Sequence, residues 1–422
     1  MSAIHLADWP RCAGRYAHGV SRSVVTKKHI RRNASLLAAV TAAAGSLITA
    51  SALAAPASAA PASPSSSHTL TVRQIVHGDQ LHHTFRVNGD GATKTESLSS
   101  PDDITQLGHD FFVTFQNGVG PQGQASPSGD LDSTIVEFTL SGREVRQWDL
   151  VGKCDGLTAW PQTGKVIATI NEDAHSSIYL INPFGAATHY HYNEALPHFG
   201  GTDAISIYHG LVLISASAPG TTGGTAPNAK YPAVYVATFN PKTKIAHMSA
   251  LFYDEALAKQ ANGPDKGKTI HLALTDPDSN QVVPFVSPLF AGDFVLDSQG
   301  DQELIFDHIE GYKQVLTALH LPHSVDDSAW ATSRHGALYT TDQVNDTVNM
   351  VYGNFTVGSA YSSTTPCDQN DAPATCPAPG FVPNYLSSLN MKTGALTRVA
   401  VNGPTLNTEG MIFVPDAPVS SR

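Results

Sequence analysis

The 422-residue chain carries 25 Lys and Arg against 36 Asp and Glu, which gives a formal net charge of −11. An acidic protein of this kind is a poor partner for nucleic acid or anionic lipid, because their phosphates repel it. Only 14% of the residues are charged, while 34 are Gly and 27 are Pro. This composition favours many short strands joined by turns and argues against a helical bundle.

The first 59 residues are expected to be a secretory signal peptide. Basic residues at 27–32 precede an apolar run over 36–53, and small-residue cleavage sites follow before residue 60. A membrane anchor is the alternative, because the apolar run is close to spanning length. Cleavage would remove seven Lys or Arg and one Asp, and would change the net charge from −11 to −17. We therefore expect a secreted, extracellular protein with no membrane partner after cleavage, exported by the Sec route or, given Arg31-Arg32, by the twin-arginine route.

A short phrase recurs along the rest of the chain, in which an acidic residue is followed within two positions by an apolar residue that opens a strand. Its copies lie at Asp103, Asp155, Asp203, Asp276, Asp327 and Glu409. Second strands are expected at 111–115, 166–170, 211–214, 294–296 and 337–340, and third strands at 177–181 and 234–237. A four-stranded unit that returns about every 50 residues is typical of a β-propeller blade.

The repeat predicts an all-β fold, a single β-propeller over residues 69–416, with a flexible linker at 60–68 and a tail at 417–422. Six opening phrases predict six blades, with seven as the alternative, because residues 348–401 are long enough to contain another. Only one strand follows Glu409, so we expect N-terminal strands at 69–76 and 81–87 to complete that blade and close the ring, which removes exposed sheet edges. One short helix is expected at 253–260.

The first strand of each propeller blade lines the central channel, so the acidic residues of the repeat are expected to ring the mouth of that channel. Three histidines, His198, His271 and His323, lie four or five residues before copies of the phrase and are candidate general bases. Gathered carboxylates repel one another unless a cation, a shared proton or a histidine offsets their charge. The candidate metal ligands are Asp103, Asp155, Asp203, Asp327, Glu409, Asn117 and Asn171. Such oxygen donors suit Ca²⁺, and a histidine contribution would suit Zn²⁺ or Mn²⁺.

A structural role is the alternative for each of these acids. An Asp at the start of an inner strand can accept hydrogen bonds from backbone amides and so hold neighbouring blades together. Cys367 and Cys376 flank a short loop and are expected to form a disulfide in an oxidising compartment, with a metal site as the alternative. Cys154 is expected to be a buried structural thiol.

The phrases Asp155-Gly156-Leu157 and Glu409-Gly410-Met411, with second strands that end in Asn or Asp, resemble six-bladed propellers of the gluconolactonase/senescence-marker type and the related NHL-repeat group. The resemblance implies a divalent cation held by a Glu, an Asn and an Asp, and hydrolysis of sugar lactones or similar esters. Glu409 would match the Glu, Asn171 or Asn117 the Asn, and Asp203 or Asp327 the Asp. This chain departs from the pattern in placing its Glu-Gly phrase in the closing blade.

Two functions follow as hypotheses. The first is a monomeric, metal-dependent lactonase, esterase or lyase that acts on a small extracellular molecule. The second is a non-catalytic scaffold that binds a protein, peptide or glycan through the Gly- and Pro-containing loops at 117–130, 219–230 and 364–383.

Overall fold

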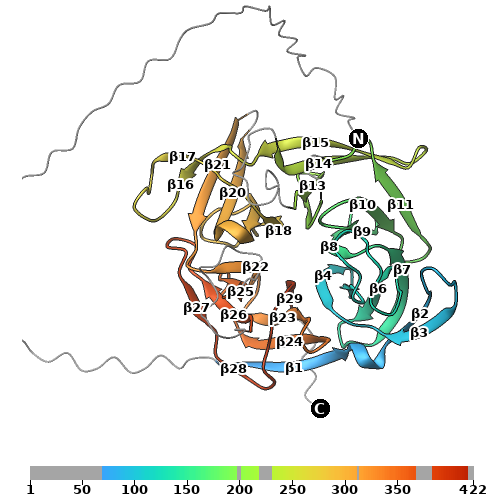
Figure 1. The fold of residues 1–422 in the computed structure, drawn as a ribbon. Helices are drawn as coiled ribbons and strands as arrows, with labels where there is room; N and C mark the ends of the chain where they lie inside the picture. Colours follow the sequence, from blue (N-terminus) through green and yellow to red (C-terminus); the bar gives the residue numbers. More distant parts are fainter. Residues whose placement is uncertain (1–68, 197–200, 218–230, 311–312, 367–382, 417–422) are drawn as a thin grey trace, which may run out of the picture. The chain divides into compact units, whose positions relative to one another are not determined.

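In a computed structural model, the described residues are 69–196, 201–217, 231–310, 313–366 and 383–416 (Figure 1). All of them belong to one compact unit, Pro64–Arg422. They form strands, turns and two 3₁₀ segments, Gly78–Gln80 and Gln299–Asp301, and no helix among them could span a membrane. The all-β prediction is confirmed. The expected signal peptide, linker and tail lie outside the described residues.

Four-stranded antiparallel groups make up most of the fold, and the first three follow the chain in order. The first group is a separate sheet of β4 (Pro101–Leu107), β5 (Asp110–Phe115), β6 (Asp132–Thr139) and β7 (Glu144–Val151). The second contains β8 (Cys154–Trp160), β9 (Lys165–Ile170), β10 (Ser177–Ile181) and β11 (Ala187–Tyr192). The third contains β12 (Ile205–Tyr208), β13 (Leu211–Ser215), β14 (Pro232–Asn240) and β15 (Ile245–Tyr253). The second and third join into one eight-stranded sheet because β11 pairs in parallel with β15.

The fourth group carries two extra strands at its outer edge. It consists of β18 (Pro277–Val282), β19 (Phe294–Ser298), β20 (Glu303–Glu310) and β21 (Lys313–His320), extended by β16 (Leu257–Gln260) and β17 (Thr269–His271). The helix expected at 253–260 is therefore wrong. Alternate residues Ala258 and Gln260 of β16 are buried, and this two-residue period is that of a strand.

In the last two groups, strands that follow one another along the chain belong to different sheets. One consists of β22 (Ser324–Trp330), β25 (Ala360–Thr365), β26 (Tyr385–Leu389) and β27 (Leu396–Arg398). The other, which we name the closing sheet, consists of β29 (Met411–Pro415), β23 (His335–Asp342), β24 (Thr347–Asn354), β1 (Leu70–His77) and β28 (Val401–Asn402). After β22 the chain thus leaves for the closing sheet and then returns. The strand expected at 337–340 exists, but it pairs with β29 instead of β22.

The N-terminal strand closes the ring. β1 pairs antiparallel with β24 and places Val72 opposite Val351. The first strand of the fold therefore lies in the same sheet as the last strand, β29. The second expected strand, at 81–87, does not take part in this sheet. Its residues form β2 (His82–Arg86), which pairs only with β3 (Thr93–Ser97).

The sheets stand around a common centre (Figure 1). Neighbour contacts run from β4 to β8, β12, β18, β22 and β29 and back to β4, so these six inner strands form a closed cycle. The fold is a β-propeller. The blade count stays a prediction, since two groups share one sheet and two others exchange strands.

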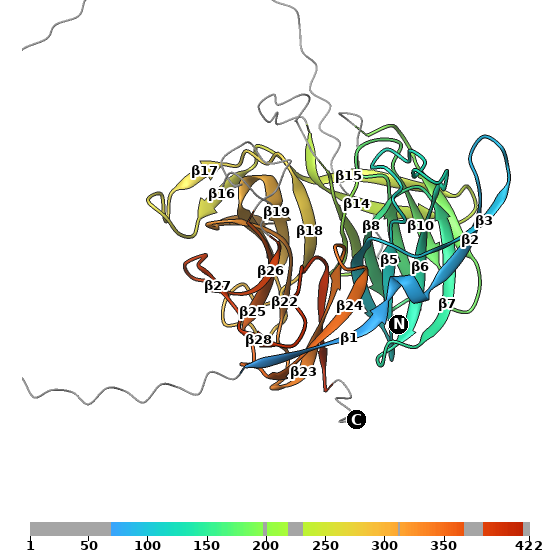
Figure 2. The ribbon, with the colours of Figure 1, turned by 60° about the horizontal axis from the view of Figure 1, so that its bottom comes forward.

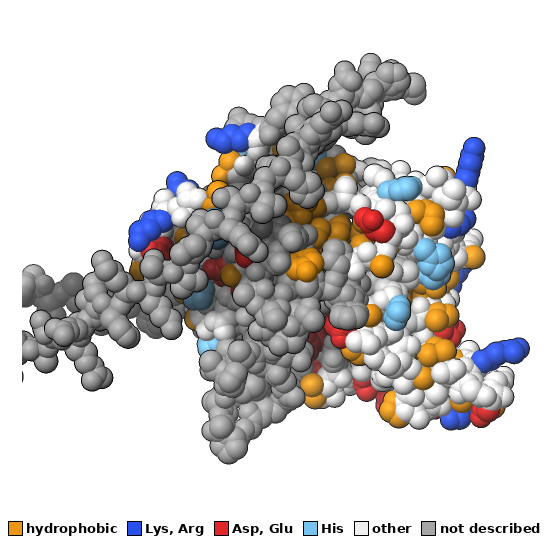
Figure 3. Space-filling view, turned by 45° about the horizontal axis from the view of Figure 1, so that its top comes forward, with side chains coloured by type: hydrophobic (Ala, Val, Ile, Leu, Met, Phe, Trp, Pro, Cys, Tyr) orange, Lys and Arg blue, Asp and Glu red, His pale blue; other side chains and the backbone are white. Residues whose placement is uncertain are grey.

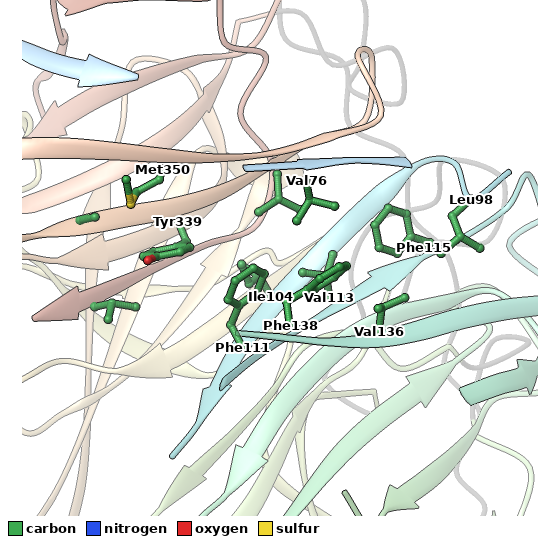
Figure 4. Packing of buried hydrophobic residues seen from close by; sticks show 13 residues of the cluster. Val76, Leu98, Ile104, Phe111, Val113, Phe115, Val136, Phe138, Tyr339 and Met350 are labelled. Carbon is green, nitrogen blue, oxygen red and sulfur yellow. The ribbon is translucent and has the colours of Figure 1, made fainter. Parts of the chain in front are cut away.

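Apolar side chains fill the space between neighbouring sheets. Between the closing sheet and the β4–β7 sheet, Phe111 stacks on Phe138 with ring centroids 5.2 Å apart and lies 5.3 Å from Tyr339 (Figure 4). Met350 and Val76 belong to the same buried cluster. Because this cluster joins the first complete group to the last, it stabilises the closure of the ring.

Hydroxyl groups near the ends of four second strands fasten one group to the next. Thr169 Oγ1 of β9 donates to the carbonyl oxygen of Asp203 at 2.7 Å. Ser215 Oγ of β13 donates to the carbonyl oxygen of Asp278 at 2.6 Å. The same contact joins Thr341 to Asp102 and Ser363 to Thr408.

The glycines of the repeated phrase allow the inner strands to approach closely. A Cβ atom at Gly156 would lie 2.3 Å from the carbonyl oxygen of Asp203, and one at Gly410 would lie 2.6 Å from that of Asp102. Such distances are far below van der Waals contact, so a larger residue would push the strands apart. The Asp-Gly-Leu and Glu-Gly-Met phrases thus mark places where two neighbouring backbones touch.

The β2–β3 hairpin extends beyond the sheets (Figure 2) and is attached through one buried histidine. His83 Nε2 lies 3.3 Å from Asp130 Oδ2, and His83 Nδ1 lies 3.4 Å from Asp149 Oδ1. Burial lowers the pKa of His83, but the hydrogen bond to Asp149 and the charges of Asp130, Asp149 and Asp132 outweigh this effect and raise it. Charged contacts thus help to hold the hairpin against the β4–β7 sheet, together with the hydrogen bond from Gln147 Nε2 to the carbonyl oxygen of His82 at 3.1 Å.

Candidate functional site

Most of the acidic residues of the repeat line one cavity of about 210 Å³ at one end of the inner strands. Its charged and amide side chains are Asp102, Asp103, Lys153, Asp155, Glu172, Asp203, Asp278, Gln299, Asp326, Asp327 and Gln343. We name it the acid cavity. Eight carboxyl groups thus line the cavity together with one lysine. On the face shown in Figure 3, the visible Lys and Arg side chains lie at the margin.

Two of the predicted ligands, Asp103 and Asp327, act as structural links between inner strands. Asp103 accepts the N–H of Ile104 in its own strand and the N–H of Leu157 in β8, both at 2.6 Å. Asp327 accepts the N–H of Ser328 and the N–H of Met411 in β29, again at 2.6 Å. Both oxygens of each carboxylate therefore bind backbone amides, which confirms the structural alternative for these two residues.

Asp155 has the same place in the repeat but different partners. Its Oδ1 accepts hydrogen bonds from Gln116 Nε2 and Lys153 Nζ, both at 2.8 Å. Its Oδ2 is buried and has no hydrogen-bond partner among the described residues, although the residue is only 5% exposed. A buried carboxylate oxygen without a donor is costly, so this atom is a candidate ligand of a cation or of a bound molecule.

Lys153 connects two of the acids. Its Nζ lies 2.8 Å from Asp155 Oδ1 and 2.5 Å from Glu172 Oε1. Burial lowers its pKa, but Asp155, Glu172 and Asp102 outweigh burial and raise it, so the amine stays protonated. An ammonium group has three N–H donors, and these two carboxylates leave one N–H for a ligand.

The crowding of carboxyl groups favours their protonated forms. Burial, reinforced by neighbouring acids, raises the pKa of Asp102, Asp203, Asp278 and Glu409 well above the ordinary value. Burial raises the pKa of Asp103 to about 7 against the effect of its amide partners. Burial and the charge of Asp155 raise the pKa of Glu172 to about 7, although Lys153 opposes them. Protons or bound cations must therefore offset the charge of the cavity.

The structure places Asn117 and Asn171, two expected metal ligands, in turns, and their role as ligands stays a prediction. Both have the left-handed conformation that Asn tolerates in turns, with φ of 53° and 64°. Asn117 Oδ1 accepts the N–H of Ser99 at 3.2 Å, and Asn171 Oδ1 accepts that of Lys153 at 3.0 Å. Neither side chain lines the acid cavity, because both stabilise the turns that follow second strands.

Glu409 lies at the margin of the acid cavity, which its neighbour Gly410 lines. Its Oε1 accepts a hydrogen bond from Asn384 Nδ2 at 3.0 Å. The pKa of Glu409 is raised by burial and by its contacts with Asp326 and Asp102. The predicted acid is therefore close to the cavity acids, but it is not among the residues of the wall.

The histidines expected above the channel do not gather in the described structure. His271 is exposed on edge strand β17, where its Nδ1 lies 3.2 Å from the carbonyl oxygen of Glu255. Its expected place is wrong because the chain before β18 forms two added strands instead of a short loop. His323 is half-buried in the loop directly before β22, as expected, but does not line the cavity.

Several other predicted residues can be placed only in part. His198, Cys367 and Cys376 lie outside the described residues, so their catalytic and disulfide roles stay predictions. Cys154 is fully buried, and burial raises the pKa of its thiol. This confirms the expected structural thiol, since a buried neutral thiol is unreactive.

Three acids that line the cavity, Asp102, Glu172 and Asp326, were not predicted as site residues. Each of them is the chain neighbour of a predicted one. Asp102 and Asp326 precede the linking acids Asp103 and Asp327, and each accepts a glutamine Nε2, from Gln343 at 2.5 Å and from Gln299 at 3.4 Å. The strand register shifts at both doubled acids, between Pro101 and Ile104 and between Val325 and Ser328, and both acids of each pair line the cavity. The doubled acids were therefore the available signal. Glu172 likewise stands beside Asn171.

The donor set is compatible with a hard cation, but it is not gathered around one point. Oxygen atoms predominate in the wall, as Ca²⁺ prefers, and Asp155 Oδ2 has no hydrogen-bond partner among the described residues. Within the described residues, however, no three His, Cys, Asp or Glu side chains form a group able to hold a metal ion. Metal binding here would require the carboxylates to move toward the ion.

No protein-family model and no curated protein matches the sequence. Among solved structures, the chain is similar to the periplasmic gluconolactonase of Pseudomonas aeruginosa, with 12% identity over 83% of this chain and 100% of that chain and a TM-score of 0.41. It is similar to a β-propeller domain from Myceliophteria thermophila, with 10% identity, coverage of 82% and 93%, and a TM-score of 0.41. A protein of unknown function from Bacteroides caccae shows 11% identity, coverage of 82% and 99%, and a TM-score of 0.42. A gluconolactonase is thus among the structures that the chain resembles, but similarity at this level carries no argument about activity.

Proposed function

We propose that the protein is a secreted β-propeller that binds a divalent cation in the acid cavity and hydrolyses a small lactone or ester there. The observation that carries the proposal is the set of eight carboxyl groups that line one cavity with Lys153, where Asp155 Oδ2 is buried and has no hydrogen-bond partner among the described residues. The Asp-Gly-Leu and Glu-Gly-Met phrases support the reaction class, and the apolar leader supports secretion.

Asp155, Asp203 and Asp278 would hold the cation, because their carboxylates are not committed to backbone amides as Asp103 and Asp327 are. Their oxygens favour Ca²⁺ over Zn²⁺ or Mn²⁺. Bound there, such an ion supplies a Lewis acid that polarises a carbonyl group. Because the carboxylates have to move, we expect weak binding, with Kd of about 10⁻⁴ to 10⁻³ M, as in other extracellular calcium modules.

The residues of the chain itself can bind and activate the ester. The third N–H of Lys153 can donate to the carbonyl oxygen of the substrate. Glu172, which is held beside it at 2.5 Å and has a pKa raised to about 7, can accept a proton from the attacking water at neutral pH. The alkoxide that leaves then takes up a proton from Glu172.

Calorimetry with Ca²⁺, Mn²⁺ and Zn²⁺, together with pH-stat assays on glucono-δ-lactone and simple esters, tests the proposal. Asp155→Asn and Asp203→Asn should each weaken Ca²⁺ binding at least about tenfold. Asp265→Asn is the matched control, because Asp265 is exposed and pairs only with Lys268. The cation proposal fails if the wild-type protein takes up none of the three ions, and the hydrolase proposal fails if no lactone or ester is cleaved.

A further inference from the structure

A second cavity adjoins the acid cavity along the channel between the inner strands. Its volume is about 270 Å³, and it shares Asp103, Ala204, Ser279 and Asp327 with the acid cavity. We name it the channel cavity. Its apolar wall comes from five inner strands and consists of Ile104, Leu157, Ala159, Ile205, Ile207, Val282, Met411 and Ile412. A molecule in this cavity would therefore touch apolar side chains at one end and carboxylates at the other.

Two buried polar atoms of this wall have no hydrogen-bond partner. Ser206 is 5% exposed, and its Oγ contacts no donor or acceptor among the described residues. Asn280 is 8% exposed, and its Oδ1 is likewise without a partner. The Nδ2 of Asn280 donates to the carbonyl oxygen of Ala204 at 2.7 Å and to Ser215 Oγ at 3.2 Å, which fixes the orientation of the amide. Both residues line the channel cavity, but these two atoms are themselves covered, so a ligand would pair with them only after a local shift of the side chains.

The charge at the adjoining end restricts which ligands can enter. Burial favours protonated forms of several of the eight carboxyl groups, but Lys153 is the one basic side chain of the wall, so the wall offers little positive charge to an anion. A phosphate or carboxylate on the ligand would stand against the ionised carboxylates in a partly buried space, where repulsion is poorly screened. An ammonium group, in contrast, could donate hydrogen bonds to several carboxylates that are spread around the cavity.

We infer that the ligand of this site is a small hydroxylated molecule that carries a protonated amine and no anionic group. Its ammonium binds among Asp155, Asp203 and Asp278 when no divalent cation occupies them, and its hydroxyl or N–H donors bind Asn280 Oδ1 and Ser206 Oγ. The inference rests on the proposed function for the position of the site, but it concerns binding and holds whether or not hydrolysis follows.

A series of sugars that differ in charge tests this inference. D-glucosamine, D-glucose and D-glucose 6-phosphate are titrated into the mature protein by calorimetry, with and without Ca²⁺, at low and at high salt. We expect D-glucosamine to bind at least about tenfold more tightly than D-glucose, glucose 6-phosphate to show no binding, and the amine preference to shrink as salt rises.

Variants separate the two ends of the site. Asp155→Asn and Asp203→Asn should reduce the preference for the amine, whereas Ser206→Ala should weaken D-glucosamine and D-glucose by the same factor. The exposed Asp265→Asn should change neither. Binding of glucose 6-phosphate as tight as that of glucose, or an amine preference that survives in Asp155→Asn and Asp203→Asn, would overturn the inference. Amine-selective binding without any lactone or ester cleavage would instead refute the hydrolase proposal alone.

Discussion

The carboxylate of Asp103 in β4 accepts the backbone N–H of Leu157 in β8 at 2.6 Å. Asp327 in β22 makes the same contact with Met411 in β29, also at 2.6 Å. An acid of one inner strand thus holds the backbone of the next, at two places around the ring. Asp155, which has the equivalent place in the repeat, binds side chains instead. The acid of the repeated phrase therefore links inner strands in some copies and binds cavity side chains in another. Mutations can separate these two roles.

Replacing a linking acid should reduce stability. Asp103→Ala removes the acceptor of two backbone N–H groups, and we expect the free energy of unfolding to fall by about 2–4 kcal/mol, because unpaired amides in a packed strand are costly. Urea denaturation measures the loss. Asp155→Asn keeps an acceptor for Lys153 and Gln116 and should cost less. Equal losses for the two variants would show that Asp103 is not a special link.

Adding a methyl group at the repeated glycines should force the inner strands apart. Gly156→Ala would place Cβ 2.3 Å from the carbonyl oxygen of Asp203, and we expect destabilisation of about 1–3 kcal/mol. Thermal unfolding followed by circular dichroism tests it. Gly185→Ala is the control, since its nearest neighbour is the flexible side chain of Asn182. A stable Gly156→Ala protein would contradict the close backbone contact.

The attachment of the β2–β3 hairpin should weaken as pH rises. Burial and neighbouring acids raise the pKa of Asp132 from 3.8 to about 6, and His83 titrates above its ordinary value of 6.5. Groups whose pKa is higher in the folded state stabilise it below the unfolded value and lose this contribution as pH passes the folded value. Stabilisation should thus decline from about pH 4 to above pH 6.5.

Hydrogen exchange of the β2 and β3 amides at pH 5 and pH 8, corrected for intrinsic exchange rates, checks this expectation. His83→Gln cannot become charged and should flatten the part of the pH dependence above pH 6. Protection that rises with pH in the wild-type protein would show that the charged contacts do not hold the hairpin.

The histidines should differ in their effect on function. His271 is exposed at the edge of a sheet, so His271→Ala should leave Ca²⁺ binding, sugar binding and any hydrolysis unchanged within a factor of two. Calorimetry and pH-stat assays on this variant provide the measurement. A loss of binding or hydrolysis of more than about tenfold would show that His271 belongs to the site and would contradict its position on β17.

Removing the N-terminal strand should open the ring. A chain that begins after His77 lacks β1 and leaves β24 with an unpaired edge, so we expect aggregation or loss of cooperative unfolding. Size-exclusion chromatography and circular dichroism measure the outcome against a chain that begins at Thr69. A monomeric, cooperatively unfolding product would show that the ring does not depend on β1.

The sequence predicted those features that repeat locally. The acid–apolar phrase located the starts of inner strands, although the acid binds the backbone of the next strand at Asp103 and Asp327 and side chains at Asp155. It did not reveal that β23 pairs with β29, since a strand's residues determine its two faces but not its partner. A helix was predicted at 253–260 because the segment contains helix-forming residues. The alternate burial of Ala258 and Gln260, which marks a strand, was not recognised.

The site was predicted to within one residue at several places. Asn171 and Asn117 were chosen where their neighbours Glu172 and Gln116 face the acid cavity or its acids, because the left-handed turn conformation directs the asparagines to the backbone. The doubled acids contained the information, but the sequence does not reveal the register shift at each pair, where both acids line the cavity. Ser206 and Asn280 carry no motif and became visible only through their lack of partners.

The exchange of strands between the last two sheets has a consequence for the time course of folding. The closing sheet combines residues from both ends of the fold with β23 and β24 from its interior. A partial chain that emerges during synthesis or export cannot complete this sheet, because β1 is made first and β29 is made last. Contacts over such long sequence separations form slowly. We therefore expect ring closure to be a late and slow step, during which the incomplete edges of the closing sheet depend on protection from other chains.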